Sequence, residues 1–311
     1  MAAKPSMVRA GRCNPQGRLV LQEVASTSAT KSRARATGRL AAELVLVAAV
    51  YFLLAKAGQF LTAYAGGTLI WPAAGVGLAA VLLCGLRVWP AIFVAAFAAV
   101  FTSEVANSTL TAAIPTSSGV ALGYAVEAAV GFYLTTLWSG GDRTFDTPAG
   151  VLKVAAIALF PSTMSGAAIA AASLSIAGYL DWSEFAARWV SWWLGDAVGA
   201  LVVTPVIVLW ARHRRNIRAR DAAEAAVVLL VTGGVAYGVF GPLLAPNVRS
   251  AAGFLVVLPL VWVTLRSSAH MTASAALVLA GLAILGGRGR PPFAFRHRFR
   301  RVIPASGPVY D

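Results

Sequence analysis

The chain is poor in charged residues, and most of all in acidic ones. It has 311 residues, of which 12 are Asp or Glu and 26 are Lys or Arg. Charged residues thus make up 12% of the chain, against roughly 25% in ordinary soluble domains. Hydrophobic residues make up 58%, and the mean hydropathy is +0.73. This composition excludes an ordinary soluble domain and indicates an integral membrane protein.

Cysteine and histidine are also scarce. Cys13 lies in a basic segment and Cys84 in an apolar one, with no Cys-x-x-Cys spacing, while His213, His270 and His297 are isolated in the sequence. These spacings indicate neither a disulfide framework nor a zinc site, so we predict no metal and no cofactor. No phosphoacceptor helix, nucleotide loop or other catalytic constellation accompanies the histidines. We therefore predict that the chain is not an enzyme.

Long apolar runs, by contrast, recur along most of the chain. Each approaches or exceeds the roughly 20 residues that a helix needs to cross a bilayer. The alternating ten-residue pattern of a transmembrane β-barrel is absent from the sequence. We predict an all-α fold, a polytopic transmembrane helical bundle with about eight to ten membrane segments. The segments are residues 40–64, 69–86, 89–105, 112–137, 151–180, 188–210, 222–244, 252–265 and 269–286.

Basic residues gather outside these segments. The net charge of +14 could suggest a nucleic-acid partner, but Lys and Arg concentrate in residues 1–39, in residues 212–220 and in the C-terminal tail. We interpret them as charges that keep loops in the cytoplasm, and we predict no nucleic-acid binding. The predicted organisation is a basic, disordered cytoplasmic leader at residues 1–39, a membrane domain at residues 40–289 and a basic tail at residues 290–311. The length of the leader and of the first apolar run favours an uncleaved helix over a secretory signal.

Alternation of the segments predicts the side on which each loop lies. With a cytoplasmic N-terminus, Arg87 and the loop 212–220 lie inside, in agreement with the positive-inside rule. A ninth crossing would export the arginine-rich tail. Either residues 252–286 form one interrupted unit or a final helix is missing, and our hypothesis is a tail that is truncated or frameshifted.

Two acids interrupt the apolar segments. Asp196 lies in the run 189–205, and Glu127 lies midway through residues 112–137. A charged carboxylate near mid-membrane costs at least about 2.5 kcal/mol, so it usually faces a protein interior or a wet cavity. The cations available to pair with the acids from another helix are Lys56, Lys153 and Arg188. For each acid, a functional or switch role and a purely structural interhelical bond both stay open.

Two Trp-Pro pairs mark predicted helix starts, where proline loses no intrahelical hydrogen bond. Tryptophan suits the membrane interface, and nearby glycines allow helices to approach closely. Structural anchoring and ligand contact explain these pairs about equally well. The residues to which we assign structural or topological roles are Pro72, Gly75, Arg87, Trp89, Pro90, Gly195, Gly199 and Pro205.

Four features together resemble a known family. They are the Trp-Pro-x-x-Gly opening at residues 71–75, the Gly-x-Arg-x-Trp-Pro turn at 85–90, the mid-helix Glu127, and the Trp-Trp-x-Gly-Asp-x-x-Gly run at 192–199 with its later Thr-Pro. This pattern, over about residues 40–289, resembles the bacterial membrane-associated sensor domain of the first type, MASE-one. Residues 287–293 resemble a turn of that family, but an arginine-rich tail follows where the family has a last helix.

The resemblance implies a sensory input module of the bacterial inner (plasma) membrane, multi-pass, with a cytoplasmic N-terminus. Such a module perceives a ligand or membrane partner and relays the signal to a histidine kinase or diguanylate cyclase output domain, which we expect on a separate cytoplasmic protein. The lipid bilayer and a homo-oligomer are further expected partners. The candidate signal-sensing residues are Asp196, Glu127, Trp71, Trp192 and Trp193.

Two other functions stay open at this point. The first is a small secondary transporter that uses Asp196 and Glu127 as proton or cation sites, which glycine-rich helices and buried acids fit equally well. The second is a scaffold in which the buried charges only specify helix packing.

Overall fold

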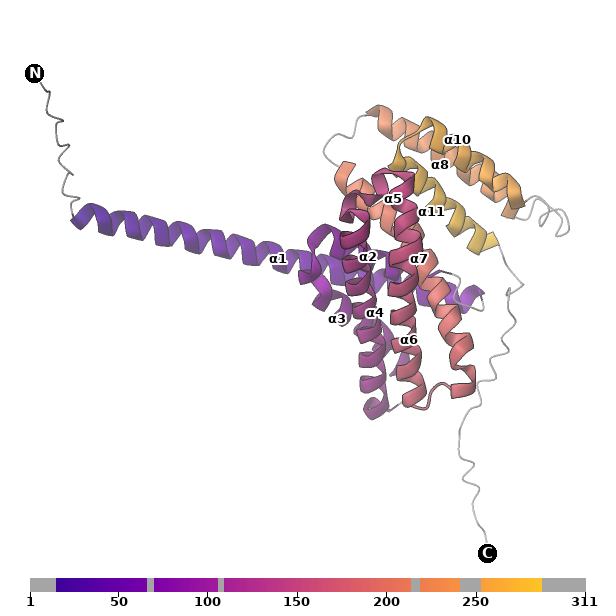
Figure 1. Ribbon diagram of the computed structural model, residues 1–311, viewed down its shortest axis with the longest axis horizontal. Coiled ribbons are helices and arrows are strands. Elements are labelled where there is room, and N and C mark those ends of the chain that lie inside the picture. Colours follow the sequence, from indigo (N-terminus) through magenta and orange to yellow (C-terminus); the bar gives the residue numbers. More distant parts are fainter. Residues whose placement is uncertain (1–14, 66–69, 106–108, 214–218, 241–252, 287–311) are drawn as a thin grey trace, which may run out of the picture.

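The structure is a computed structural model that describes residues 15–65, 70–105, 109–213, 219–240 and 253–286 (Figure 1). All regular secondary structure in these ranges is helical, which confirms the predicted all-α class for the described part of the chain. The basic tail at residues 290–311 and its predicted truncation lie outside the described residues. So does most of the basic loop 212–220.

Six helices of the described ranges are long and apolar enough to cross a membrane, and three shorter apolar helices accompany them. The count of eight to ten membrane segments stays a prediction. The long spans contain α1 (Pro15–Ala65), α3 (Trp89–Glu104), α4 (Leu110–Ser139), the continuous stretch of α5 (Pro148–Lys153), the π-helical turn η3 (Val154–Leu159) and α6 (Phe160–Ile176), then α7 (Phe185–His213) and α8 (Ala219–Phe240). The shorter ones are α2 (Pro72–Cys84), α10 (Val257–Arg266) and α11 (Ala269–Gly286).

The first helix differs from the prediction made for the leader. Because α1 begins at Pro15, residues 15–39 are helical in the structure, where the composition predicts disorder. Alanine and arginine, which favour helix, are frequent there, and an apolar helix follows without a break. Figure 1 shows this first part of α1 projecting away from the other helices, and residues 33–39 are exposed.

The helix at the centre of the bundle is α2. Every residue from Ala73 to Val81 is buried, because α2 packs against α1, α4 and α7. A helix that is apolar on all sides is expected in such a position. Its 13 residues span about 20 Å, less than the roughly 30 Å of a hydrocarbon core. α2 is therefore a buried core helix, and its neighbours form the lipid-facing surface.

Both Trp-Pro pairs lie at helix starts, as predicted. Trp71 is the N-cap residue of α2 and Pro72 its first residue, while α3 begins with Trp89 and Pro90. The turn between these helices depends on Gly85, whose φ of 81° lies in the left-handed region that glycine adopts without strain. A short 3-10 turn, η1 (Leu86–Val88), then leads into α3.

The last three helices form a second, smaller group beside α7. A small apolar cluster of Val228, Val263, Met271 and Ala275 joins α8, α10 and α11, and Trp210 of α7 packs against it. Figure 1 shows α8 and α10 on the outer side of this group, with α11 nearer to α7. Residues 253–286 are thus interrupted at Ser267 and Ser268, between α10 and α11.

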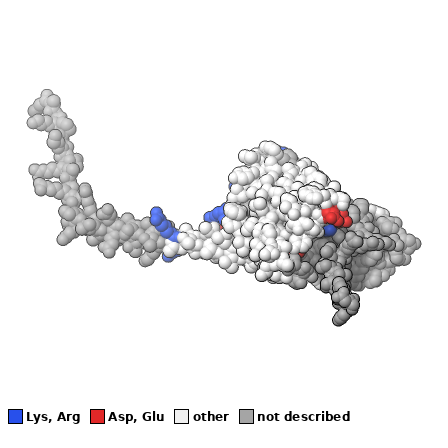
Figure 2. Space-filling view, turned by 90° about the horizontal axis from the view of Figure 1, so that it is seen from below, with Lys and Arg blue, Asp and Glu red and all other residues white. Residues whose placement is uncertain are grey.

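Charged pairs lie at one end of the bundle. Arg87 donates to Glu43 of α1 at 2.7 Å, and Arg212 at the end of α7 donates to Asp146 at 2.7 Å. Because α2 and α7 run in the same direction, Arg87 and Arg212 lie at the same end, which we call the basic end. The predicted topology also places them on one side. On the face in Figure 2, the described body of the bundle is almost free of charge.

Candidate functional site

The two intramembrane acids are both buried inside the bundle. Asp196 on α7 is 2% exposed and Glu127 on α4 is 5% exposed. Their carboxyl groups lie close enough for their charges to interact. The prediction that these acids face the protein interior is therefore confirmed, and the fold brings together two acids that lie far apart in the sequence.

The sequence of α7 explains how Asp196 reaches the interior. The buried positions of this helix recur at helical spacing, and most of them carry small side chains that permit close packing. They are Gly195, Asp196, Gly199, Ala200, Val203, Thr204 and Val208. Pro205, which we predicted to be structural, lies inside the same helix beside this face.

The buried face of α7 lies directly against the backbone of α2. The N–H of Trp71 donates to the carbonyl oxygen of Gly195 at 2.9 Å, and the hydroxyl of Thr204 donates to the carbonyl oxygen of Gly75 at 3.0 Å. A Cβ added at Gly199 would overlap the carbonyl group of Trp71, and a Cβ added at Gly75 would lie 2.5 Å from the carbonyl oxygen of Gly199. At both glycines the two helices therefore lie too close together to leave room for a side chain.

Two tyrosines complete the surroundings of the acids. Tyr124 lies three residues before Glu127 on α4, and its ring stacks on that of Trp71 with centroids 6.0 Å apart. Tyr51 of α1 is 1% exposed, and its ring meets Tyr124 edge to face at 6.4 Å. Both tyrosines lie within electrostatic reach of the two acids. We call these five residues, Tyr51, Trp71, Tyr124, Glu127 and Asp196, the acid cluster.

Sequence reasoning did not select the two tyrosines. A signal for Tyr124 was available, because positions three apart share a helix face, so Tyr124 lies on the side of α4 that carries Glu127. The signal for Tyr51 was weaker, since a tyrosine inside an apolar run is as well suited to the membrane interface as to the core.

Three polar atoms of the acid cluster are buried without a hydrogen-bond partner among the described residues. They are Oε2 of Glu127, the hydroxyl of Tyr51 and Nε1 of Trp71. A buried polar group without a partner costs about 1–3 kcal/mol, and more when it is charged. At the junction of α1, α2 and α4 the cluster therefore offers one hydrogen-bond acceptor and two groups that can donate. A bound species or a rearrangement of the helices could satisfy these hydrogen bonds.

The cations that the sequence offered as partners have other contacts. The ammonium of Lys56 donates to the carbonyl oxygen of Ala99 at 3.0 Å and to the hydroxyl of Ser103 at 2.9 Å, both on α3. Lys153 is exposed. Of these two available cations, Lys56 therefore bonds to α3 and Lys153 points to the surface. The guanidinium of Arg188 lies 5.8 Å from the ring centroid of Trp192.

The remaining two candidate tryptophans have contacts of a different kind. Trp192 is half-buried beneath Arg188. Trp193 stacks on Trp189 with centroids 6.1 Å apart and meets Phe160 of α6 at 5.6 Å. The structure therefore unites three of the five predicted sensing residues. It places the other two toward the start of α7, where Trp192 contacts a guanidinium group and Trp193 contacts other aromatic rings.

Two of the histidines that are isolated in the sequence come together in the structure. The rings of His213 on α7 and His270 on α11 stack with centroids 4.0 Å apart, and Trp210 meets His270 at 4.9 Å. His297 lies outside the described residues. Within the described part of the chain, no group of three or more His, Cys, Asp or Glu side chains is arranged to hold a metal ion.

Comparison with known families places these features in context. The family model MASE1 matches residues 42–302, which is most of the chain. No curated protein and no solved structure matches the chain.

Proposed function

The chain belongs to the MASE1 family of membrane sensory domains, and from this premise we propose that it is a non-catalytic signal-input module whose acid cluster is the sensing element. In this proposal the cluster has two packings, and a signal selects one of them. A signal can do so only through a difference in its affinity for the two packings. A second carboxyl group next to a buried one provides such a difference, because protonation or a bound cation changes the repulsion between them.

The observation that carries the proposal is Oε2 of Glu127, buried without a partner beside a second buried acid. A carboxyl group that served only to join helices would be expected to have its hydrogen bonds satisfied. Glu127 also lies against α6, where a Cβ added at Gly166 would lie 2.5 Å from Oε2 of Glu127. A change in the charge or rotamer of Glu127 would therefore affect the packing of α6 as well as that of α7.

The contacts of α7 support transmission of the signal from the acid cluster to α11. The N-terminal half of α7 carries Asp196, while near its C-terminal end the indole N–H of Trp210 donates to the hydroxyl of Ser274 on α11 at 2.8 Å. A movement of α7 against α2 would thus displace α11. We propose that the signal reaches a separate cytoplasmic signalling protein of the histidine kinase or diguanylate cyclase type, with the N-terminus and the basic end on the cytoplasmic side of the bacterial inner membrane.

The transporter alternative is not favoured, because the family to which the chain belongs is sensory. The scaffold alternative makes a different prediction from ours. In a scaffold, neutralising either acid would change stability without changing which packing is populated.

The test measures packing directly. The full chain, reconstituted in lipid nanodiscs with one spin label on α4 and one on α7, is examined by double electron–electron resonance at pH 5.5 and pH 8.0, with protons as the probe. We expect the distance distribution to change with pH in the unmodified chain and to stay constant in Glu127→Gln and Asp196→Asn. Glu184→Gln is the control, because Glu184 is exposed in η4 (Trp182–Glu184). A distribution that does not depend on pH in any of them would contradict the proposal.

A further inference from the structure

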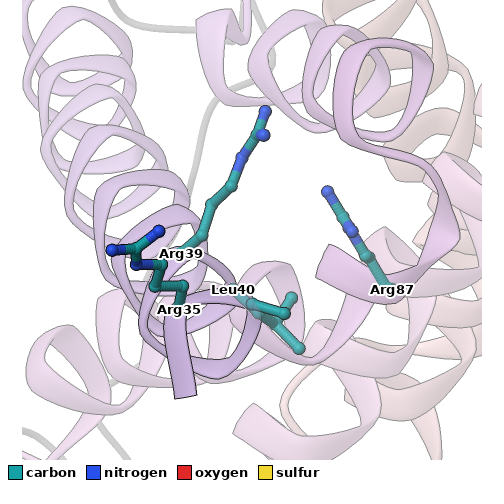
Figure 3. Close-up of a pocket in the computed structure, with 5 residues that line it drawn as sticks. Arg35, Arg39, Leu40 and Arg87 are labelled. Atoms are coloured by element: carbon teal, nitrogen blue, oxygen red, sulfur yellow. The ribbon is translucent and has the colours of Figure 1, made fainter. Parts of the chain in front are cut away.

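A hollow of about 430 Å³ lies at the basic end of the bundle, between α1 and the turn η1 (Figure 3). Its lining combines guanidinium groups with apolar side chains. The lining residues are Arg35, Ala36, Arg39 and Leu40 of α1 and Arg87 of η1. Figure 3 shows the side chains of Arg39 and Arg87 extending from different elements on opposite sides of the open space.

A shared acid orients two of these arginines. Glu43 accepts from Nε of Arg39 at 3.1 Å with one carboxylate oxygen and from an Nη of Arg87 at 2.7 Å with the other. A guanidinium has five N–H donors, so each arginine keeps most of its donors for another acceptor. The three arginines of the lining outnumber this one acid, and the hollow therefore carries a surplus of positive charge.

The surroundings of the hollow are those of a lipid surface. Arg35 and Arg39 lie in the first turns of the candidate membrane span Arg33–Thr62. Large apolar side chains, among them Val45 and Leu46, are exposed one to two turns further along the same helix. The hollow is thus at the boundary where a basic helix surface becomes an apolar one, the depth at which phospholipid headgroups lie.

We propose that this hollow binds the phosphate headgroup of an anionic phospholipid. Guanidinium groups match phosphate oxygens in paired, charge-assisted hydrogen bonds, and basic hollows at the ends of membrane helices suit anionic headgroups. Leu40 and Ala36 offer an apolar wall for the glycerol region, which a soluble phosphate would leave unused. The site differs from the acid cluster, but α1 carries both the hollow and Tyr51, so an occupied hollow would fix α1 against the turn that follows α2.

The test uses the full chain in detergent micelles and native mass spectrometry, which counts bound lipids. Phosphatidylglycerol is the anionic probe and phosphatidylcholine the zwitterionic one. We expect the unmodified chain to retain phosphatidylglycerol. We expect the double variant Arg39→Gln with Arg87→Gln to bind this lipid at least about tenfold more weakly. The matched control is Arg143→Gln with Arg266→Gln, which removes the same charge from two exposed arginines outside the hollow.

Two further arms make each outcome decisive. The double variant Arg39→Lys with Arg87→Lys keeps the positive charge, and it serves as the test variant if the glutamine variant does not fold. We expect it to bind phosphatidylglycerol more weakly than the unmodified chain does, because lysine cannot form the paired contact with phosphate. Competition with inorganic phosphate separates a headgroup from a free anion. Equal loss in the control pair, unchanged binding in both hollow variants, or displacement of the lipid by millimolar phosphate would each overturn the proposal.

Discussion

The backbone N–H of Trp71 donates a hydrogen bond to the carbonyl oxygen of Gly195 at 2.9 Å. This bond joins the residue that starts α2 to the residue that precedes Asp196. Trp71 also stacks on Tyr124, three residues before Glu127. A single residue therefore contacts the neighbourhoods of both buried acids, which is why the start of α2 is central to the site.

The close approach of α2 and α7 predicts that Gly199→Ala is destabilising. The new methyl group would overlap the backbone carbonyl of Trp71, which cannot move aside as a flexible side chain can. We expect a loss of about 1–3 kcal/mol of stability. The measurement is thermal unfolding in detergent. Gly281→Ala on α11, where the added atom meets nothing within 4 Å, is the matched control and should cause no loss. Equal stability of the two variants would contradict the prediction.

The hydroxyl of Thr204 predicts a smaller effect. Thr204→Val keeps the shape of the side chain but removes the hydrogen bond to Gly75, and we expect a loss of about 0.5–1.5 kcal/mol. In the control Thr264→Val the lost bond is an exposed one within α10, to the carbonyl oxygen of Leu260 at 2.7 Å. Chemical denaturation of both variants in the same micelle gives the comparison. A control as costly as Thr204→Val would show that the interhelical bond has no special weight.

The proximity of the two acids predicts energetic coupling. In a double-mutant cycle of Glu127→Gln and Asp196→Asn, we expect the effects on unfolding free energy to depart from additivity by at least about 0.5 kcal/mol. The reason is that each neutral variant removes the repulsion felt by the other acid. A second cycle combines Glu127→Gln with Asp146→Asn, an acid paired with Arg212 at the basic end. Additive effects in both cycles would mean that the two buried carboxyl groups do not interact.

The different surroundings of the candidate tryptophans predict unequal effects. Trp71→Ala removes a buried ring that stacks on Tyr124, and we expect a loss of about 3–5 kcal/mol. Trp192→Ala removes a half-buried ring beneath Arg188, and we expect less than half of that loss. Thermal unfolding of both variants, with Trp71→Phe as the conservative substitution, checks the order. A larger loss for Trp192→Ala would reverse our view of which tryptophan supports the site.

The sequence alone determined the class of the protein and the local structure. Twenty-residue apolar runs leave a helix as the conformation that satisfies the backbone in a membrane, and Pro72 and Pro90 mark helix starts because proline tolerates the first turn. The burial of Glu127 and Asp196 followed from the cost of exposing a carboxylate to lipid. Each of these conclusions depends on one residue or one segment and its solvent.

The tertiary structure decided which residues meet. That Trp71 contacts residues close to both acids, that Lys56 bonds to α3 and that His213 stacks on His270 all depend on the register and order of helices far apart in the chain. The same holds for α2, whose apolar composition fits a membrane span but whose position between α1, α4 and α7 makes it the core. In a bilayer, lipid solvates an apolar helix face as well as protein does, so hydrophobicity cannot specify the partner of a helix. Small-residue contacts and buried polar groups specify it, and these exist only once the helices are packed.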